Sequence, residues 1–139
     1  MRQNINFRIV VFLMGFLLFF NGCFMLIAAG VSYLFKEGIV LEITFSAFSI
    51  LGIGALAILL TRKHDAKIQK REGYLIVALG WFLMTLSGLL PYWISGFIPN
   101  FSASFFETMS GYTTTGATIL ADIEALPKSL LFWRSVTHW

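Results

Sequence analysis

The sequence predicts an all-α membrane protein, and three features lead to that prediction. Hydrophobic residues make up 58% of the 139 residues and charged residues only 12%, whereas an average soluble domain carries roughly 25% charged residues. A chain this short has too much surface for its volume to bury so much apolar material. The apolar residues also fall into three runs long enough for helices that cross a bilayer. The composition therefore excludes a soluble enzyme domain, a disordered tail and a nucleic-acid-binding protein.

The first apolar run extends from about Ile9 to Phe35. As a helix it would be about 40 Å long, which exceeds the ~30 Å hydrocarbon core and implies a tilt or a protruding end. Basic residues precede it, as in a signal peptide, but the run is about twice as long as a signal-peptide core. Cleavage near residues 28–30 is the alternative. Asn21 is the one strongly polar side chain in the run, and we expect its amide to bond a neighbouring helix.

A short turn leads to the second run, from about Ile39 to Leu60. Within it, the spacing Gly52-x-Gly54-x-x-Ala57 superficially matches a dinucleotide-binding fingerprint. That fingerprint requires a preceding strand and a βαβ unit, which an apolar span does not supply. In a membrane span, small residues favour close packing between helices. We therefore expect residues 1–61 to form a leading pair of transmembrane helices.

Residues 62–73 form a polar loop with the basic residues Arg62, Lys63, Lys67, Lys70 and Arg71. Short loops rich in Lys and Arg usually stay in the cytoplasm, so we expect this loop to be cytoplasmic. The loop lacks the interleaved aromatic residues that stack on bases, so no nucleic-acid partner is expected. The third apolar run extends from about Tyr74 to Ile94, and Pro91 is expected to bend or end its helix.

The basic loop fixes the expected topology. With this loop inside, the second span runs inward, and the first and third spans run outward. The N-terminus, with Arg2 and Arg8, is then cytoplasmic, in agreement with the same rule. The chain from about Gly96 onward begins on the outer side of the membrane.

The stretch 98–118 is too short and too polar to cross the membrane as a helix. Ser104 and Glu107 have the spacing of a capping box, which predicts that a helix begins near Ser104. Gly111 is the expected terminator. A helix over 104–111 would be roughly 12 Å long, less than half of a bilayer.

A threonine- and glycine-rich run follows this half-helix: Thr113, Thr114, Thr115, Gly116, Ala117 and Thr118. Irregular backbone at membrane depth must be buried in protein or line a water-filled cavity, as a pore loop does. Rows of backbone carbonyls can replace the water around a cation, and Gly116 tolerates the backbone angles that would turn them toward it. The C-terminus of a half-helix also favours a cation. We expect 113–118 to be a filter strand, and an ordinary external connector is the alternative.

Several motifs of the chain resemble a known family. They are Phe105-Phe106-Glu107-x-x-Ser110-Gly111-x-Thr113-Thr114-Thr115-Gly116-Ala117-Thr118, Leu126-Pro127, Phe132-x-Arg134-x-x-x-x-Trp139 and Lys70-Arg71-Glu72-Gly73-Tyr74-Leu75-Ile76. Together they resemble the TrkH/TrkG-type potassium-uptake proteins of bacteria, in the Trk/Ktr/HKT superfamily. The two leading spans favour the Trk type over its Ktr relatives, which lack this helix pair.

The resemblance implies an extra helix pair followed by four pseudo-repeats of span, pore loop and span, so that one chain mimics a tetrameric cation channel. Residues 74–139 would be the first repeat, with its pore helix at 104–111, its filter at 113–118 and the start of its second span. Only one filter strand is present, and family members continue for several hundred residues. The resemblance therefore implies an N-terminal fragment of a transporter or a truncated product.

The resemblance also implies a function and partners. Gly116 would be the filter glycine, and the carbonyls of Thr114 and Thr115 would bind potassium, the transported ion. Potassium uptake across the bacterial inner membrane would involve a TrkA-type cytosolic regulatory subunit that binds NAD or ATP, and a homodimer of the full-length protein. Whether uptake is channel-like or coupled to protons or sodium stays open. The rival hypotheses are a small multi-span interaction or assembly protein and a fragment without function.

Two charged residues, Glu107 and Arg134, are expected near the filter. A charge at membrane depth marks a functional site by default. We expect a supporting role instead, in which Glu107 caps the pore helix and Arg134 pairs with it or with carbonyls. No enzyme is expected, because Ser110-Gly111 lacks the nucleophile-elbow pattern. His64 and His138 lack the spacing of a metal site.

Overall fold

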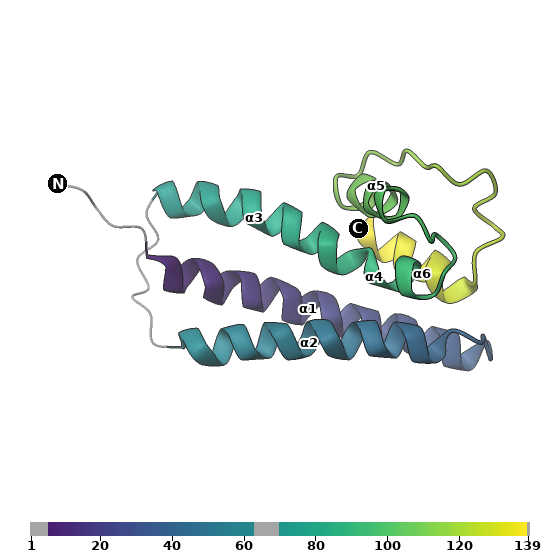
Figure 1. Ribbon diagram of the computed structural model, residues 1–139, viewed down its shortest axis with the longest axis horizontal. Helices are drawn as coiled ribbons and strands as arrows, with labels where there is room; N and C mark the ends of the chain where they lie inside the picture. Colours follow the sequence, from purple (N-terminus) through teal and green to yellow (C-terminus); the bar gives the residue numbers. More distant parts are fainter. Residues whose placement is uncertain (1–5, 63–69, 139) are drawn as a thin grey trace.

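The computed structural model describes residues 6–62 and 70–138, and within them every regular element is helical. In chain order these are α1 (Phe7–Leu34), α2 (Val40–Thr61), α3 (Lys70–Gly88), α4 (Leu90–Ile94), α5 (Phe101–Tyr112) and α6 (Lys128–Thr137). The three long helices lie side by side, and α4, α5 and α6 gather toward one end of them (Figure 1). The predicted all-α fold is confirmed.

Three helical stretches are long and apolar enough to cross a membrane: α1, α2 and Lys70–Ile94, which comprises α3 and α4. Their bounds match the predicted runs closely, except that α3 begins at Lys70 rather than at Tyr74. Lys and Arg are good helix formers and Glu72 suits a first turn, which explains the earlier start. The part of the predicted cytoplasmic loop at 63–69 lies outside the described residues.

Large apolar side chains cover the outer faces of these helices. On α2 the exposed ones are Leu41, Phe45, Phe48, Ile53, Leu56, Leu59 and Leu60. A soluble monomer rarely exposes so continuous an apolar surface, so these faces suit contact with lipid. In Figure 1, α1 and α3 run in the same direction and α2 runs in the opposite one, as successive membrane spans require.

Small residues allow α1 and α2 to pack closely. A Cβ atom added to Gly54 would lie 2.6 Å from the backbone nitrogen of Phe19. One added to Gly15 would lie 2.8 Å from the Cβ of Ala57. Backbones approach this closely only where a side chain is absent or small. The packing role predicted for Gly54 and Ala57 is confirmed, whereas Gly52 faces open space and takes no part in it.

The third span is interrupted between α3 and α4. Pro91 lies at the start of α4, and it has no N–H to donate into the preceding turn. The backbone N–H of Tyr92 donates to the carbonyl of Leu89 at 3.1 Å. The carbonyl of Gly88 accepts instead from Nε1 of Trp133 at 2.9 Å. The interruption predicted at Pro91 is confirmed, and the carbonyl that it releases holds α6 against the span.

The main core lies where α1, α2, α4 and α6 meet. Its most deeply buried members include Met25 and Ile43 from the leading pair, Tyr92 from α4, and Leu130 and Trp133 from α6. Within the leading pair, α1 packs directly on α6, the helix that follows the threonine- and glycine-rich run, and α2 packs on α4.

Candidate functional site

α5 leads into the threonine- and glycine-rich run, and Asn100 caps its start. The Oδ1 atom of Asn100 accepts from the backbone N–H groups of Ser102 at 2.9 Å and Ala103 at 3.3 Å. Ser104 already lies inside the helix, where its N–H donates to the carbonyl of Asn100, and its hydroxyl donates to the carbonyl of Ile98 at 2.7 Å. The predicted capping box of Ser104 and Glu107 is therefore wrong, because Asn100 is the N-cap residue and the helix begins before Ser104. The helix is 12 residues long, about 18 Å, which is still much shorter than a bilayer.

The C-terminus of α5 also differs from the prediction. The helix passes through Gly111 and ends at Tyr112. The N–H of Thr115 then donates to the carbonyl of Ser110 at 3.0 Å, and that of Thr114 to the carbonyl of Gly111 at 2.8 Å. This pair of bonds is a Schellman motif, and its left-handed residue is Thr114, with φ +55°.

Gly111 serves packing rather than termination. A Cβ atom at Gly111 would lie 2.6 Å from Oγ1 of Thr137 on α6 and 3.4 Å from Cε1 of His138. Because α6 approaches so closely, only glycine fits at this position. His138 itself places Nδ1 2.7 Å from the carbonyl of Arg134, and His64 lies outside the described residues.

Residues 113–118, here called the Thr/Gly segment, are exposed and lie between α5 and α6. Gly116 has φ +73°, so a second left-handed residue follows Thr114. In an extended strand, successive carbonyls point to opposite sides, and left-handed residues break that alternation. Gly116 thus adopts a backbone angle of the kind that glycine tolerates.

The carbonyl oxygens of the Thr/Gly segment are largely unbonded. Within the described parts of the chain, no N–H or O–H donates to the carbonyls of Thr113, Thr114, Thr115 or Gly116. The hydroxyl of Thr113 turns back to the carbonyl of Met109 at 2.7 Å and contacts Oγ1 of Thr115 at 2.9 Å. The segment therefore presents a short row of free backbone oxygens.

Ser110 holds this row in place from α5. Its carbonyl accepts from the N–H of Thr115 and, at 3.4 Å, from that of Gly116. Its hydroxyl donates to the carbonyl of Ala117 at 2.6 Å. Ser110 thus contacts the segment on both sides of Gly116. No local pattern indicates this role, because it depends on how the chain turns after α5.

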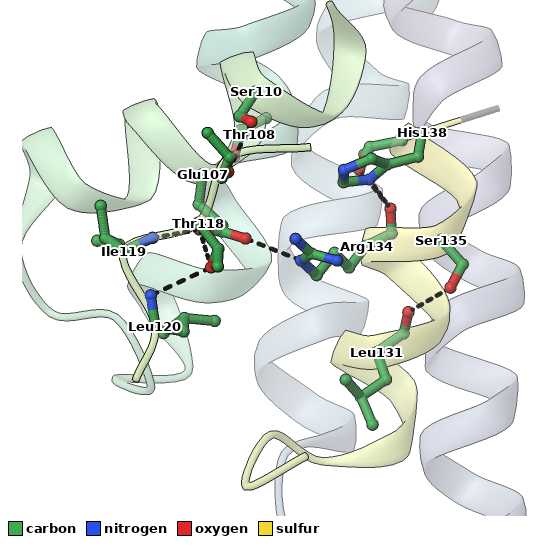
Figure 2. Close-up of polar contacts among 12 residues, drawn as sticks. Glu107, Thr108, Ser110, Thr118, Ile119, Leu120, Leu131, Arg134, Ser135 and His138 are labelled. Atoms are coloured by element: carbon green, nitrogen blue, oxygen red, sulfur yellow. Dashed lines mark hydrogen bonds and ion pairs between the residues drawn. The ribbon is translucent and has the colours of Figure 1, made fainter. Parts of the chain in front are cut away.

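Glu107 holds the far end of the Thr/Gly segment. Its side chain is completely buried, and Oε2 accepts from Oγ1 of Thr118 at 2.9 Å and from the N–H of Ile119 at 3.3 Å. Its other oxygen, Oε1, accepts from Nε of Arg134 at 2.8 Å (Figure 2). The predicted pairing of Glu107 with Arg134 is confirmed, while the capping of α5 by Glu107 is wrong. The carboxylate instead accepts from Thr118, the last residue of the segment, and from Ile119, which follows it.

Asn21 connects the leading pair to the start of the segment. Its Nδ2 donates to Oγ of Ser87 on α3 at 2.7 Å, and its Oδ1 accepts from the hydroxyl of Tyr112 at 2.7 Å. The interhelical bonding predicted for this amide is confirmed, and the amide bonds two helices, α3 and α5. A cavity of about 860 Å³ adjoins these side chains, and Asn21, Tyr112 and Thr114 contribute to its largely apolar lining.

Glu37 connects the leading pair to α6. It lies in the turn between α1 and α2 and accepts from the N–H of Lys128 at 2.6 Å and from the hydroxyl of Ser129 at 2.5 Å. Pro127, the N-cap residue of α6, supplies no side-chain cap. A carboxylate satisfies the free N–H groups at a helix start and suits the positive end of its dipole. No sequence pattern indicated this contact, because its partners lie 91 residues apart.

Comparisons with known proteins agree with this architecture. The family model TrkH, described as a cation transport protein, matches residues 38–139. The Trk system potassium uptake protein TrkH of Vibrio parahaemolyticus is 35% identical over 136 residues, which are 96% of this chain and 28% of that protein. The Trk system potassium uptake protein TrkG of Escherichia coli is 34% identical over 131 residues, 92% of this chain and 27% of that protein.

A solved structure gives the same result for the fold. The crystal structure of the potassium transporter TrkH from Vibrio parahaemolyticus superposes with a TM-score of 0.85 at 35% identity. The match covers 94% of this chain and 28% of that one. The chain thus spans little more than a quarter of the length of the relatives that it matches.

Proposed function

Because the chain belongs to the TrkH family of cation transport proteins, which are transporters rather than enzymes, we propose that it forms the N-terminal part of a potassium-uptake protein of the plasma membrane. The names of its relatives support potassium as the transported ion. Three apolar helices with exposed apolar faces support the membrane location. Since the chain spans 28% of those relatives, uptake is an activity of the longer protein.

The observation that carries this proposal is the row of unbonded carbonyls from Thr113 to Gly116. A potassium ion that sheds its water needs replacement oxygens, and backbone carbonyls supply them in potassium filters. The left-handed angles at Thr114 and Gly116 support a backbone that is not an ordinary strand. We assign the carbonyls of Thr114 and Thr115 as the potassium ligands of this strand.

α5 acts in this proposal as the pore helix. Its C-terminus is at Tyr112, directly before the Thr/Gly segment. The partial negative charge at that end favours a cation beside the segment. Glu107 and Arg134 neutralise each other and hold the segment, so neither of them needs to bind the ion.

A single filter strand cannot surround an ion. The full-length protein would supply further strands from further repeats of span, pore loop and span, with residues 74–139 in the first. In the same proposal the N-terminus and the basic loop are cytoplasmic. The partners are a second copy of the full-length protein and a TrkA-type cytosolic subunit that binds NAD or ATP.

The direct test is potassium-uptake rescue. The full-length protein would be expressed with a TrkA-type subunit in bacteria that lack their own potassium-uptake systems. Growth at low potassium and uptake of potassium in preference to sodium are the expected results. A full-length protein that reaches the membrane but restores neither growth nor uptake would overturn the proposal.

A further inference from the structure

We propose that the leading helix pair positions both ends of the first filter strand, with Asn21 fixing its start and Glu37 its end. This inference rests on the proposed function of the Thr/Gly segment. Neither residue touches the segment, so each acts through another side chain or helix. The role would explain why the polar groups of an otherwise apolar helix pair reach toward α5 and α6.

At the start of the segment, Tyr112 is the last residue of α5 and directly precedes Thr113. Its hydroxyl donates to Oδ1 of Asn21, and the amide of Asn21 is in turn fixed by Ser87. Asn21 is 3% exposed, so losing one of its bonds would leave a buried polar group unsatisfied, which is costly. Tyr112 also lines the cavity of about 860 Å³, and its hydroxyl ties it to α1. The bond to Asn21 therefore fixes where the segment begins.

At the other end, the turn between α1 and α2 holds the start of α6. Glu37 accepts three bonds there, from the N–H of Lys128 and from the N–H and hydroxyl of Ser129. The ammonium of Lys128 also lies 4.2 Å from the ring centroid of Phe35 in the same turn. Ser129 is completely buried. The turn thus determines where α6 begins.

α6 transmits this position to the segment. It is a helix of 10 residues that carries Arg134 in its last turn. Arg134 bonds Glu107, and Glu107 bonds Thr118 at the end of the segment (Figure 2). A shift at Lys128 and Ser129 would therefore move the carboxylate that holds the segment.

The test uses the full-length protein and measures potassium uptake per transporter in the membrane as a function of potassium concentration. Tyr112→Phe and Glu37→Gln are expected to raise the KM for potassium by about threefold to tenfold, the loss that one hydrogen bond implies. Tyr33→Phe, at a side chain that is 74% exposed, and Glu124→Gln, on the exposed loop before α6, are the matched controls. Both controls are expected to keep the original KM.

A double variant tests whether Asn21 acts through Tyr112. Asn21→Leu is expected to raise the KM in the original protein but to add little to Tyr112→Phe. If Asn21→Leu does not reach the membrane, the KM of Tyr112→Phe alone tests the contact between Asn21 and Tyr112. If both Tyr112→Phe and Glu37→Gln lower the maximum rate but keep the original KM, the two contacts stabilise the protein without positioning the filter strand. That result would overturn the inference.

The failure of this inference differs from the failure of the proposed function. If Gly116→Ser changes ion preference while Tyr112→Phe and Glu37→Gln leave the KM unchanged, the filter assignment stands and the positioning role is overturned. If Gly116→Ser leaves uptake and ion preference unchanged, the filter assignment is overturned and the positioning role with it, whereas the proposed function is overturned only if the unchanged full-length protein restores no potassium uptake.

Discussion

Nε of Arg134 donates to Oε1 of Glu107 across 2.8 Å, and this ion pair joins α6 to α5. A charge buried at membrane depth is costly unless it is paired and its remaining oxygens are bonded. Glu107 meets both conditions, since its second oxygen accepts from Thr118 and Ile119. The pair therefore stabilises the two helices and fixes the end of the Thr/Gly segment together.

Glu107→Gln should destabilise the protein by about 3 kcal/mol, because it leaves the guanidinium of Arg134 without a counter-charge. The expected result is a lower Tm of the purified protein in detergent. Preference for potassium over sodium should persist, because Ser110 still holds the carbonyl row. Glu124→Gln removes an exposed charge and should change stability by less than about 0.5 kcal/mol. A lost ion preference in Glu107→Gln would mean that this carboxylate acts on the ion directly.

Ser110→Ala should impair uptake more than stability. The variant keeps the backbone carbonyl that accepts from Thr115 but loses the hydroxyl that donates to Ala117. One lost hydrogen bond corresponds to about 1 kcal/mol. We expect a higher KM for potassium in the full-length protein, measured by uptake at varied concentration. Ser49→Ala removes a hydroxyl that bonds only within α2 and should keep the original KM, so equal KM values in all three proteins would contradict the role of Ser110.

Trp133→Phe should lower the Tm, because it removes the donor to the carbonyl of Gly88 and leaves space in the core. Trp133 is completely buried, and an unbonded buried carbonyl costs about 1–3 kcal/mol. Trp81→Phe, at a side chain that is 44% exposed, should have a much smaller effect. Thermal unfolding in detergent compares the two variants, and a similar Tm for both would contradict the account of the break at Pro91.

Gly54→Ala and Gly52→Ala, both on α2, distinguish the effect of helix packing on stability from the effect of helix propensity. The added methyl group at Gly54 would clash with the backbone of Phe19, whereas at Gly52 it would meet nothing. Gly54→Ala should lower the Tm, and Gly52→Ala should keep or raise it, since alanine is favoured over glycine in a helix by about 1 kcal/mol. The opposite order of Tm values would show that α1 and α2 do not pack as described.

The three spans and the bonding of Asn21 could be predicted because they follow from composition. Long apolar runs have one stable form in lipid, and a lone amide within them must find a partner. The start of α5 was mispredicted for a local reason. Ser104 and Glu107 match a capping pattern, but Asn100 occupies the cap one turn earlier and caps the helix first.

Other features depend on residues that are distant in sequence. Position 111 requires glycine because Thr137 on α6 approaches it closely. Glu37 stabilises the start of α6 because Lys128 and Ser129 donate hydrogen bonds to it. Neither pairing leaves a pattern in its own stretch of sequence. Thr114 goes against local preference, since a β-branched residue with positive φ is strained by about 1–3 kcal/mol. Such strain is typical of functional sites, where the surrounding contacts maintain it.

Gly116 and Gly96 offer the most direct test of the filter assignment. They have nearly the same backbone, with φ +73° and φ +76°, and an added Cβ atom would meet nothing at either position. Serine therefore strains both sites equally, but only Gly116 lies in the carbonyl row. The measurement is the ratio of potassium to sodium uptake by full-length Gly116→Ser and Gly96→Ser at equal amounts in the membrane. The account predicts that Gly116→Ser lowers this ratio or abolishes potassium uptake while Gly96→Ser keeps both, and an unchanged ratio and rate in Gly116→Ser would show that the Thr/Gly segment is only a connector.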